Sequence, residues 1–311
     1  QRYTEASTNT IDVVLWVNGL AVASVELKNP LTGQNVNDAI AQYRNDRDAK
    51  DLFLSKRAVV HFAVDPHLAY MTTHLAGAAT RFLPFNQGHD GHQGNPPATD
   101  GRHATAYLWE KVWQRDAFLD LIGRFIHVEV DDKGKQTGPV IFPRYHQWDC
   151  VLRLETDARS NGAGHRYLVQ HSAGSGKSNS IAWLAHRLSQ LHDAHDKSVF
   201  DKVIVITDRR VLDDQLSATV GQFEAKAGVV RRIESAGGAK NKDLADALTT
   251  ATARIIVCTL QTFSYVDATL AVGRRNYAVI VDEAHSSQTG EAAKDLKSVL
   301  GATTEDERLA I

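Results

Sequence analysis

The sequence predicts an α/β protein built from two domains. Helical patterns separate five short apolar runs that have the length of strands, at residues 140–142, 167–169, 203–206, 255–258 and 278–281. Strands that alternate with helices are typical of a parallel sheet with helices on both faces. Near the N-terminus, alternating apolar residues over 11–28 indicate a β-hairpin instead.

A polar break at 131–135 (Asp-Asp-Lys-Gly-Lys) marks the predicted boundary, so we place the first domain at 1–132 and the second at 133–311. Within the first domain, residues 104–126 have a helical pattern, and the Gly-, His- and Asn-rich segment 86–103 is typical of a loop. The chain opens without Met and stops after a charged run. We therefore expect truncation of the first domain at its N-terminus and of the second at its C-terminus.

Composition argues against several classes of protein. The formal net charge is −2, so contact with nucleic acid would need a local basic face. The two cysteines, Cys150 and Cys258, lie far apart beside apolar residues, which argues against a disulfide or a zinc ribbon and favours a reducing cytosol. No apolar run reaches the length of a membrane span and no signal peptide is present. We therefore expect a cytoplasmic protein with no membrane partner.

Residues 171–178 (His-Ser-Ala-Gly-Ser-Gly-Lys-Ser) form a candidate phosphate-binding loop between a predicted strand and a predicted helix. Small residues let backbone N–H groups close around phosphates, and the helix N-terminus adds partial positive charge. Lys177 can reach the phosphates and Ser178 can bind Mg²⁺, although His171 replaces the usual first glycine. A Gly/Ser linker is the alternative interpretation. The candidate nucleotide contacts are Ser172, Ala173, Gly174, Ser175, Gly176, Lys177 and Ser178.

An acidic pair, Asp282 and Glu283, follows the apolar run 278–281, and Ala-His completes the motif. Asp282 is placed to hold Mg²⁺, and Glu283 is placed to orient and deprotonate an attacking water. Alone, such a pair is more often a helix cap. Its position about a hundred residues after a phosphate-binding loop favours a nucleoside triphosphatase.

The hairpin over 11–28 has apolar residues at its odd positions, apart from Gly19, and we expect that odd face to be buried. A two-residue Asn18-Gly19 loop would mix the two faces. We therefore predict a three-residue loop over 17–19 or an equivalent bulge, with a positive φ at Gly19. In this register Asp12 lies opposite Ser24, and Glu26 is its diagonal neighbour on the same face.

Asp12, Glu26 and Lys28 are therefore the candidate residues of a second active site. Two carboxylates close enough to share one Mg²⁺, with a lysine beside them, suit metal-dependent phosphodiester hydrolysis. The cation activates water and the lysine steadies or deprotonates the nucleophile. The alternative is the polar solvent face of an edge hairpin.

Asp12 followed by Glu26-Leu27-Lys28 resembles the PD-(D/E)xK nuclease core. Together with the phosphate-binding loop and the Asp-Glu-Ala-His box, the chain resembles the restriction (motor) subunit of type I restriction–modification enzymes. The strings 26–34 and 170–178 look characteristic of that family. The resemblance implies a PD-(D/E)xK domain with a central mixed sheet, followed by the first of two RecA-like motor domains.

The resemblance also implies a function. It implies an ATP- and Mg²⁺-dependent translocase of double-stranded DNA in bacteria or archaea, which cleaves unmodified DNA away from the recognition site. It implies methyltransferase and specificity subunits as partners. Since the second motor domain would lie beyond Ile311, the chain as given should bind nucleotide but hydrolyse it poorly. Two alternatives remain: a superfamily 2 helicase whose N-terminal domain only binds DNA or partners, and a non-enzymatic fragment that docks them.

Further motifs of the family fall in order. Residues 144–147 (Arg-Tyr-His-Gln) resemble the motif that reads the adenine edge, with Gln147 as the bidentate residue. Residues 207–210 and 259–263 resemble motifs that track a nucleic-acid backbone, although ordinary helix capping fits them equally. The family carries Gln-x-x-x-Tyr on the helix after the nuclease lysine. Here Tyr43 is present but Ala39 stands at the glutamine position, and the adjacent Gln42 could substitute. We expect one face of this helix to carry Val36, Ala39, Ile40 and Tyr43.

Overall fold

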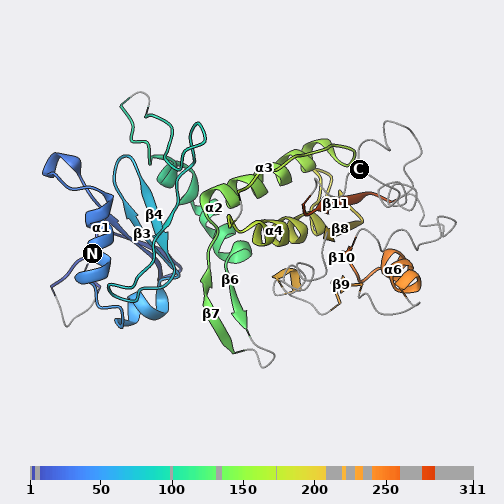
Figure 1. The fold of residues 1–311 in the computed structure, drawn as a ribbon, viewed down its shortest axis with the longest axis horizontal. Coiled ribbons are helices and arrows are strands. Elements are labelled where there is room, and N and C mark those ends of the chain that lie inside the picture. The colour runs from blue at the N-terminus through green and yellow to red at the C-terminus, as the bar shows by residue number, and fades with distance from the viewer. Residues whose placement is uncertain are drawn as a thin grey trace. The chain divides into compact units, whose positions relative to one another are not determined.

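The structure is a computed structural model that describes residues 2–3, 8–98, 101–130, 135–172, 174–207, 219–221, 228–233, 240–259 and 275–283 (Figure 1). The chain divides into two compact units, Gln1–Trp148 and Asp149–Ile311. In the described part of the chain, no helix combines the length and the apolar character that crossing a membrane requires.

The division lies after Trp148, whereas the polar break had suggested a boundary between 132 and 133. The strands on the two sides of that break, β6 (His127–Val130) and β7 (Gln136–Ile141), pair antiparallel within the first unit. A charged stretch with a glycine is as typical of a hairpin connection as of a linker between domains. Only the pairing of β6 with β7 distinguishes a hairpin from a boundary between domains here.

The first unit is built on a five-stranded mixed sheet in the order β1-β2-β3-β4-β5. Strands β2 and β3 are parallel, and the other neighbouring pairs are antiparallel. The strand bounds are β1 (Val13–Val17), β2 (Leu20–Leu27), β3 (Val60–Val64), β4 (Ala69–Thr72) and β5 (Leu83–Pro84). The mixed sheet implied by the resemblance is confirmed.

The β1–β2 hairpin has a different register from the one expected. Asn18 and Gly19, with φ of 49° and 81°, form a two-residue turn closed by Val17 and Leu20, so the three-residue loop was wrong. Asn-Gly suits such a turn because both positions need positive φ. A bulge at Val22 then restores the pairing of like faces, and Val13 lies opposite Val25. The positive φ at Gly19 and the alternative of an equivalent bulge are confirmed.

The bulge changes the partner of the first carboxylate. Val14 pairs with Ser24, so continuing this register toward the N-terminus brings Asp12 opposite Glu26 and not opposite Ser24. The expected diagonal relation between the two carboxylates is therefore wrong. Burial of the odd face requires odd-numbered residues to pair with odd-numbered residues. A bulge meets this requirement as well as a longer loop does.

Helix α1 (Val36–Asn45) covers one face of this sheet. Asn35 and Asp38 form a capping box at its start, and Asp65 Oδ2 accepts a hydrogen bond from Val36 N. The buried residues of the helix are Val36, Ala39, Ile40 and Tyr43, which confirms their expected common face. The helix lies over the even-numbered residues of β2, so Ser24 and Glu26 are fully buried. The alternative interpretation of this face, a polar solvent side of an edge hairpin, does not fit this burial.

The opposite face of the sheet packs on an aromatic cluster, in which Phe62 contacts Phe85, Trp113 and Phe142. The region 104–126 is helical but broken into π-helical and α-helical segments: η3 (Leu108–Val112), α2 (Arg115–Asp120) and η4 (Leu121–Phe125). Two short helices complete the unit, η1 (Pro30–Thr32) and η2 (Phe53–Arg57).

The second unit contains a four-stranded sheet in the order β11-β8-β10-β9, and every neighbouring pair is parallel. The strands are β8 (Lys202–Thr207), β9 (Val230–Arg232), β10 (Ile255–Thr259) and β11 (Tyr277–Val281). The helices are α3 (Tyr145–Asn161), which begins in the first unit, α4 (Lys177–Ser189) and α6 (Lys240–Thr249).

Helices cover both faces of this sheet. Val203 and Val205 of β8 pack in a cluster with Ala182 and Ala185 of α4. The alternate residues, Ile204 and Ile206, pack in a second cluster with Leu244 and Ala247 of α6. Because successive side chains of a strand point to opposite faces, both faces of β8 are buried. The predicted parallel α/β sheet is confirmed for the runs 203–206, 255–258 and 278–281, whereas the run 140–142 falls at the end of β7, which pairs antiparallel with β6 in the first unit.

One predicted strand is absent. Residues 167–169 form no strand, and Leu168 is 76% exposed. The hydroxyl group of Tyr167 donates a hydrogen bond to the Asp157 carboxylate, and the ring does not pack in the core. A three-residue apolar run is too short to show a periodicity, so its composition alone could not distinguish a strand from a loop.

Candidate active sites

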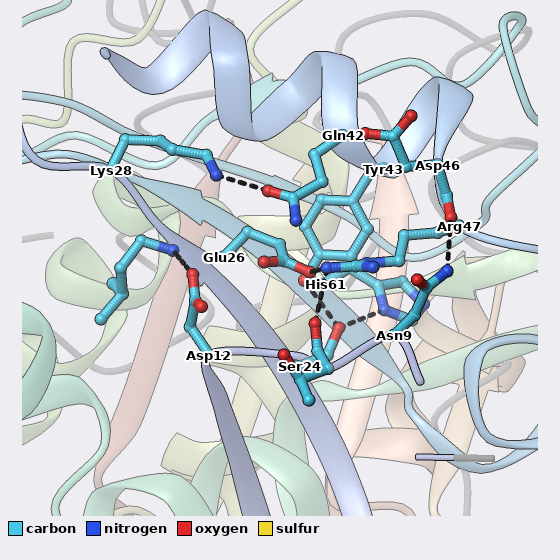
Figure 2. Close-up of polar contacts among 12 residues, drawn as sticks. Asn9, Asp12, Ser24, Glu26, Lys28, Gln42, Tyr43, Asp46, Arg47 and His61 are labelled. Carbon is cyan, nitrogen blue, oxygen red and sulfur yellow. Dashed lines mark hydrogen bonds and ion pairs between the residues drawn. The ribbon is translucent and has the colours of Figure 1, made fainter. Parts of the chain in front are cut away.

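The first site lies where β1 begins and β2 ends (Figure 2). Glu26 is fully buried on β2, whereas Asp12 is exposed just before β1. Asp12 Oδ2 accepts a hydrogen bond from Leu27 N at 2.8 Å, which ties the two strand ends together. The Asp12 carboxylate lies near enough to Glu26 to raise the pKa of Glu26.

Lys28 continues the same side of β2. Its backbone N–H donates to Val64 O at 2.9 Å, which fixes the residue against β3. Its Nζ donates to Gln42 Oε1 of α1 at 2.5 Å. The lysine that the sequence singled out is therefore held by the glutamine that could substitute for the missing family residue. Ala39, at the family position, is fully buried in the core.

Tyr43 has a different environment. It is fully buried, and its hydroxyl makes a 2.8 Å hydrogen bond with Ser24 Oγ. The same Ser24 Oγ lies 2.7 Å from His61 Nδ1. Burial lowers the pKa of His61 to about 4, so the imidazole is neutral near pH 7. Tyr43 thus anchors α1 to the centre of the sheet.

Arg47, two residues beyond α1, is a site residue that the sequence analysis missed. Its Nη2 lies 2.6 Å from Glu26 Oε1, and its Nε donates to the same oxygen at 2.8 Å. The Nη2 also donates to Thr10 O at 2.7 Å. Glu26 and Arg47 are 21 residues apart in the sequence, Glu26 on β2 and Arg47 after α1. No spacing rule connects such residues, so no local signal could have found the pair.

The electrostatics of Glu26 suit a cation ligand. Burial raises the pKa of Glu26 from 4.5 to about 7, and the Asp12 charge adds to this, while Arg47 acts in the opposite direction. Among the described residues, Glu26 Oε2 has no hydrogen-bond partner although it is buried. A divalent cation would give this oxygen a positively charged partner. Among the described residues, no three His, Cys, Asp or Glu side chains lie close enough together to hold a metal ion. Asp12 and Glu26 would therefore supply only part of the coordination of a cation.

The second site lies at the start of α4. Gly174 and Gly176 have φ of 71° and 83°, a conformation that glycine adopts without strain. Gly176 caps the helix, and Lys177 and Ser178 form its first turn. Ser172 and Ser175 belong to the same loop, whereas Ala173 lies outside the described residues. Backbone N–H groups of a loop and a helix start are thus presented together, as a phosphate requires.

The acidic pair meets this loop. Lys177 Nζ lies 2.9 Å from Glu283 Oε1, across 106 residues of sequence. The hydrogen bond to Glu283 raises the pKa of Lys177, and Asp282 contributes in the same direction. Asp282 N donates to Ile206 O, so the backbone at the end of β11 is fixed to β8. Glu283 has a φ of 55°, a left-handed conformation that is uncommon for a residue other than glycine.

The other residues predicted from motifs are Gln147 and those of the segments 207–210 and 259–263. Gln147 is buried in the first unit, and its Oε1 accepts a hydrogen bond from Arg144 N at 2.8 Å, so its role toward adenine stays a prediction. Thr207 and Thr259 end β8 and β10. The other residues of those two motifs, at 208–210 and 260–263, lie outside the described residues, as do residues 284–285.

Two family models match the chain. The model described as the type I restriction enzyme R protein N terminus matches residues 1–80. The model described as the SWI2/SNF2 ATPase matches residues 146–305, which is about half of the chain. The two matches follow one another in the same order as the two candidate sites.

Individual relatives are more distant. The chain is 25% identical over 302 residues to the type I restriction enzyme HindI endonuclease subunit of Haemophilus influenzae. The alignment covers 91% of this chain but 26% of that protein, so the chain spans about a quarter of its length. The crystal structure of the UvsW helicase from bacteriophage T4 aligns with a TM-score of 0.39 and 17% identity, over 60% of this chain and 56% of that one. A second T4 UvsW structure aligns with a TM-score of 0.37 and 18% identity, over 60% and 31%.

Proposed function

Because the chain belongs to the SWI2/SNF2 ATPase family and begins with the N-terminal part of a type I restriction enzyme R protein, we propose that it is the nuclease and first motor region of a restriction subunit. In this proposal ATP drives translocation along double-stranded DNA, and a Mg²⁺-dependent site then cleaves unmodified DNA. Methyltransferase and specificity subunits would be its partners, as the resemblance implies.

The observation that carries the nuclease proposal is the meeting of Asp12, Glu26 and Lys28 at one end of the hairpin (Figure 2). A solvent-exposed polar face would not bury a carboxylate with an unpartnered oxygen, because a buried polar atom without a partner destabilises the fold. The exposed Asp12 leaves the site open to solvent on one side.

The roles of these residues follow from their chemistry. Mg²⁺ bound by Asp12 and Glu26 would activate water and neutralise charge on the scissile phosphate. The half-buried ammonium of Lys28 would hold the attacking water or the phosphate oxygen beside the carboxylates. The Gln42 carbonyl oxygen restricts Lys28 Nζ to one direction, so we propose that Gln42 positions it.

The motor roles rest on the contact between Lys177 and Glu283. In the proposal Lys177 binds the phosphates of ATP, and Ser178 with Asp282 holds Mg²⁺. Glu283 orients and deprotonates the attacking water. Lys177 and Glu283 lie in contact, so the proposed phosphate-binding group and the proposed base belong to one site. Gln147 would contact the adenine edge, and the loop 172–176 would wrap the phosphates with its backbone.

Cleavage of supercoiled plasmid by the assembled complex tests the proposal. We expect linear product only when both ATP and Mg²⁺ are present. ATP hydrolysis and translocation without cleavage would favour a superfamily 2 helicase whose N-terminal unit only binds DNA or partners. Loss of ATP hydrolysis as well would indicate a non-enzymatic docking fragment.

A further inference from the structure

We propose that Arg47 is a positioning residue that reserves one oxygen of Glu26, Oε2, for the divalent cation of the nuclease site. The inference rests on the proposed nuclease function and extends it to a residue that neither the motif nor the comparisons assign. It depends on how Arg47 divides its hydrogen bonds between Glu26 and the strand that carries Asp12.

Arg47 binds only one of the two carboxylate oxygens of Glu26. Its Nε and Nη2 both approach Oε1, at 2.8 and 2.6 Å. The other oxygen, Oε2, is buried and has no hydrogen-bond partner among the described residues. Arginine–carboxylate pairs are frequently bidentate, with one N–H group on each oxygen. The arrangement here saturates Oε1 and leaves Oε2 available.

Arg47 also connects the two strands that carry the carboxylates. Its Nη2 donates to Thr10 O at 2.7 Å, two residues before Asp12. The Arg47 and Glu26 side chains are 4% and 0% exposed, so water does not compete for these contacts. One rigid guanidinium thus sets the direction of the Glu26 carboxylate and the backbone that leads to Asp12 (Figure 2).

A lysine could not replace this arrangement. Its ammonium is a point charge on a flexible stem and lacks the planar fork that reaches Oε1 and Thr10 O together. Arg47→Lys therefore keeps the positive charge beside the site but loses the joint contact. The substitution separates the positioning of Glu26 from the electrostatic effect of a nearby cation.

Arg44 provides a matched control. It lies on α1, three residues before Arg47, and its Nε and Nη2 also share one acceptor, Thr80 O, at 3.1 and 2.9 Å. Thr80 lies outside the carboxylate site. Arg44→Lys removes an arginine–carbonyl contact from α1, at a more exposed residue than Arg47, and leaves Glu26 untouched.

The experiment measures Mn²⁺ binding to the full 311-residue chain by calorimetry, without DNA or nucleotide. The signal considered is the part that Glu26→Gln removes, so a cation at the nucleotide site does not contribute. We expect Arg47→Lys to weaken this binding at least about tenfold, as loss of an outer-shell partner of a metal ligand does. Arg44→Lys should bind Mn²⁺ as the unsubstituted chain does.

The outcomes separate the two levels of the proposal. If the unsubstituted chain binds no Mn²⁺ that depends on Glu26, the nuclease function itself fails. If it binds and Arg47→Lys binds equally well, only the role of Arg47 is overturned. Tighter binding by Arg47→Ala would also overturn it, because Arg47 would then merely repel the cation. Should Arg47→Ala not fold, Arg47→Lys carries the test, with thermal unfolding as the check on folding.

A crystal structure with Mn²⁺ gives a second, independent readout. We expect the ion on Oε2 of Glu26, with the contact between Arg47 and Oε1 retained. Coordination through Oε1, or through both oxygens, would contradict the inference.

Discussion

At the scale of single residues, the candidate nuclease site contains a contact that would replace a missing family feature. The family glutamine position is occupied by Ala39, which is fully buried and packs with Ala63. One helical turn later Gln42 is half-buried and reaches Lys28 from the same helix. The side-chain amide of Gln42 thus lies beside Lys28, as the proposed substitution for the family glutamine requires.

Removing this amide should impair cleavage selectively. Gln42→Ala frees Lys28 Nζ to rotate away from the carboxylates, and misplacement of a reacting group commonly lowers a rate by about 10–100-fold. We expect plasmid cleavage by the assembled complex to fall by this amount while DNA-dependent ATP hydrolysis is unchanged. Gln34→Ala, at an exposed residue before α1, is the control. Cleavage at the original rate would show that Lys28 is positioned without Gln42.

The buried His61 predicts a dependence of stability on pH. Its pKa is lowered by burial to about 4, below the usual 6.5, so the folded chain favours the neutral ring. The contribution of His61 to the free energy of unfolding is fully present above pH 6.5. It is lost as the pH falls toward 4, by about 1.4 kcal/mol per pH unit. Glu26 acts in the opposite direction, because its pKa is raised and its contribution is lost as the pH rises from 4.5 to 7.

The two trends oppose each other, so the measurement must isolate His61. We expect the difference in unfolding free energy between the original chain and His61→Asn to shrink by about 2 kcal/mol between pH 6.5 and 5. Urea unfolding at several pH values measures it. A difference that stays constant over this range would contradict the lowered pKa of His61.

At the scale of elements, α1 organises the nuclease site. Its side chains and the residue two positions beyond it contact two residues of β2 and the residue that follows this strand: Tyr43 with Ser24, Arg47 with Glu26 and Gln42 with Lys28. Alternate residues of a strand share one face, so a single helix can orient all three. The position of α1 therefore decides the geometry of the site.

Weakening the start of α1 should destabilise the first unit. Asn35 caps the helix, accepting a hydrogen bond from Asn37 N and completing a capping box with Asp38. We expect Asn35→Ala to lower the unfolding free energy by about 1 kcal/mol, measured by chemical denaturation. Asn37→Ala, in the same exposed turn, should change it by less than about 0.5 kcal/mol, since the Asn37 backbone donates this bond. Equal effects of the two substitutions would exclude capping as the cause.

At the scale of the whole molecule, the two candidate sites belong to different compact units. Asp12, Glu26 and Lys28 lie in the first unit, whereas Lys177 and Glu283 lie in the second. The described contacts of each site come from its own unit. Their chemistry should therefore be separable by substitution.

We expect the assembled Lys28→Ala enzyme to hydrolyse ATP in a DNA-dependent way but to lose at least about 100-fold in cleavage, since Lys28 acts on the reacting atoms. Lys177→Ala should lose both activities, because the charge that would bind the phosphates is removed and, in the proposed function, cleavage follows translocation. Triplex displacement reports translocation and plasmid linearisation reports cutting. Loss of ATP hydrolysis in Lys28→Ala would show coupling between the units, and normal cutting would make the hairpin a binding platform.

The sequence by itself determined the local features. The strands β8, β10 and β11 were predicted because each contains a continuous apolar run; β8 and β10 are buried on both faces, and β11 is partly buried. The face of α1 followed from helical spacing. The residues of both candidate sites were named from motifs, since the order of residue types along the chain is enough to suggest their chemistry.

Only the tertiary structure decided the features that depend on distant partners. It placed the bulge at Val22, which brings Asp12 opposite Glu26, and it covered the even face of β2 with α1. It left residues 167–169 unpaired and brought Arg47 to Glu26. Register, burial and long-range ion pairs are set by which surfaces meet, and a local pattern fits several such arrangements equally well.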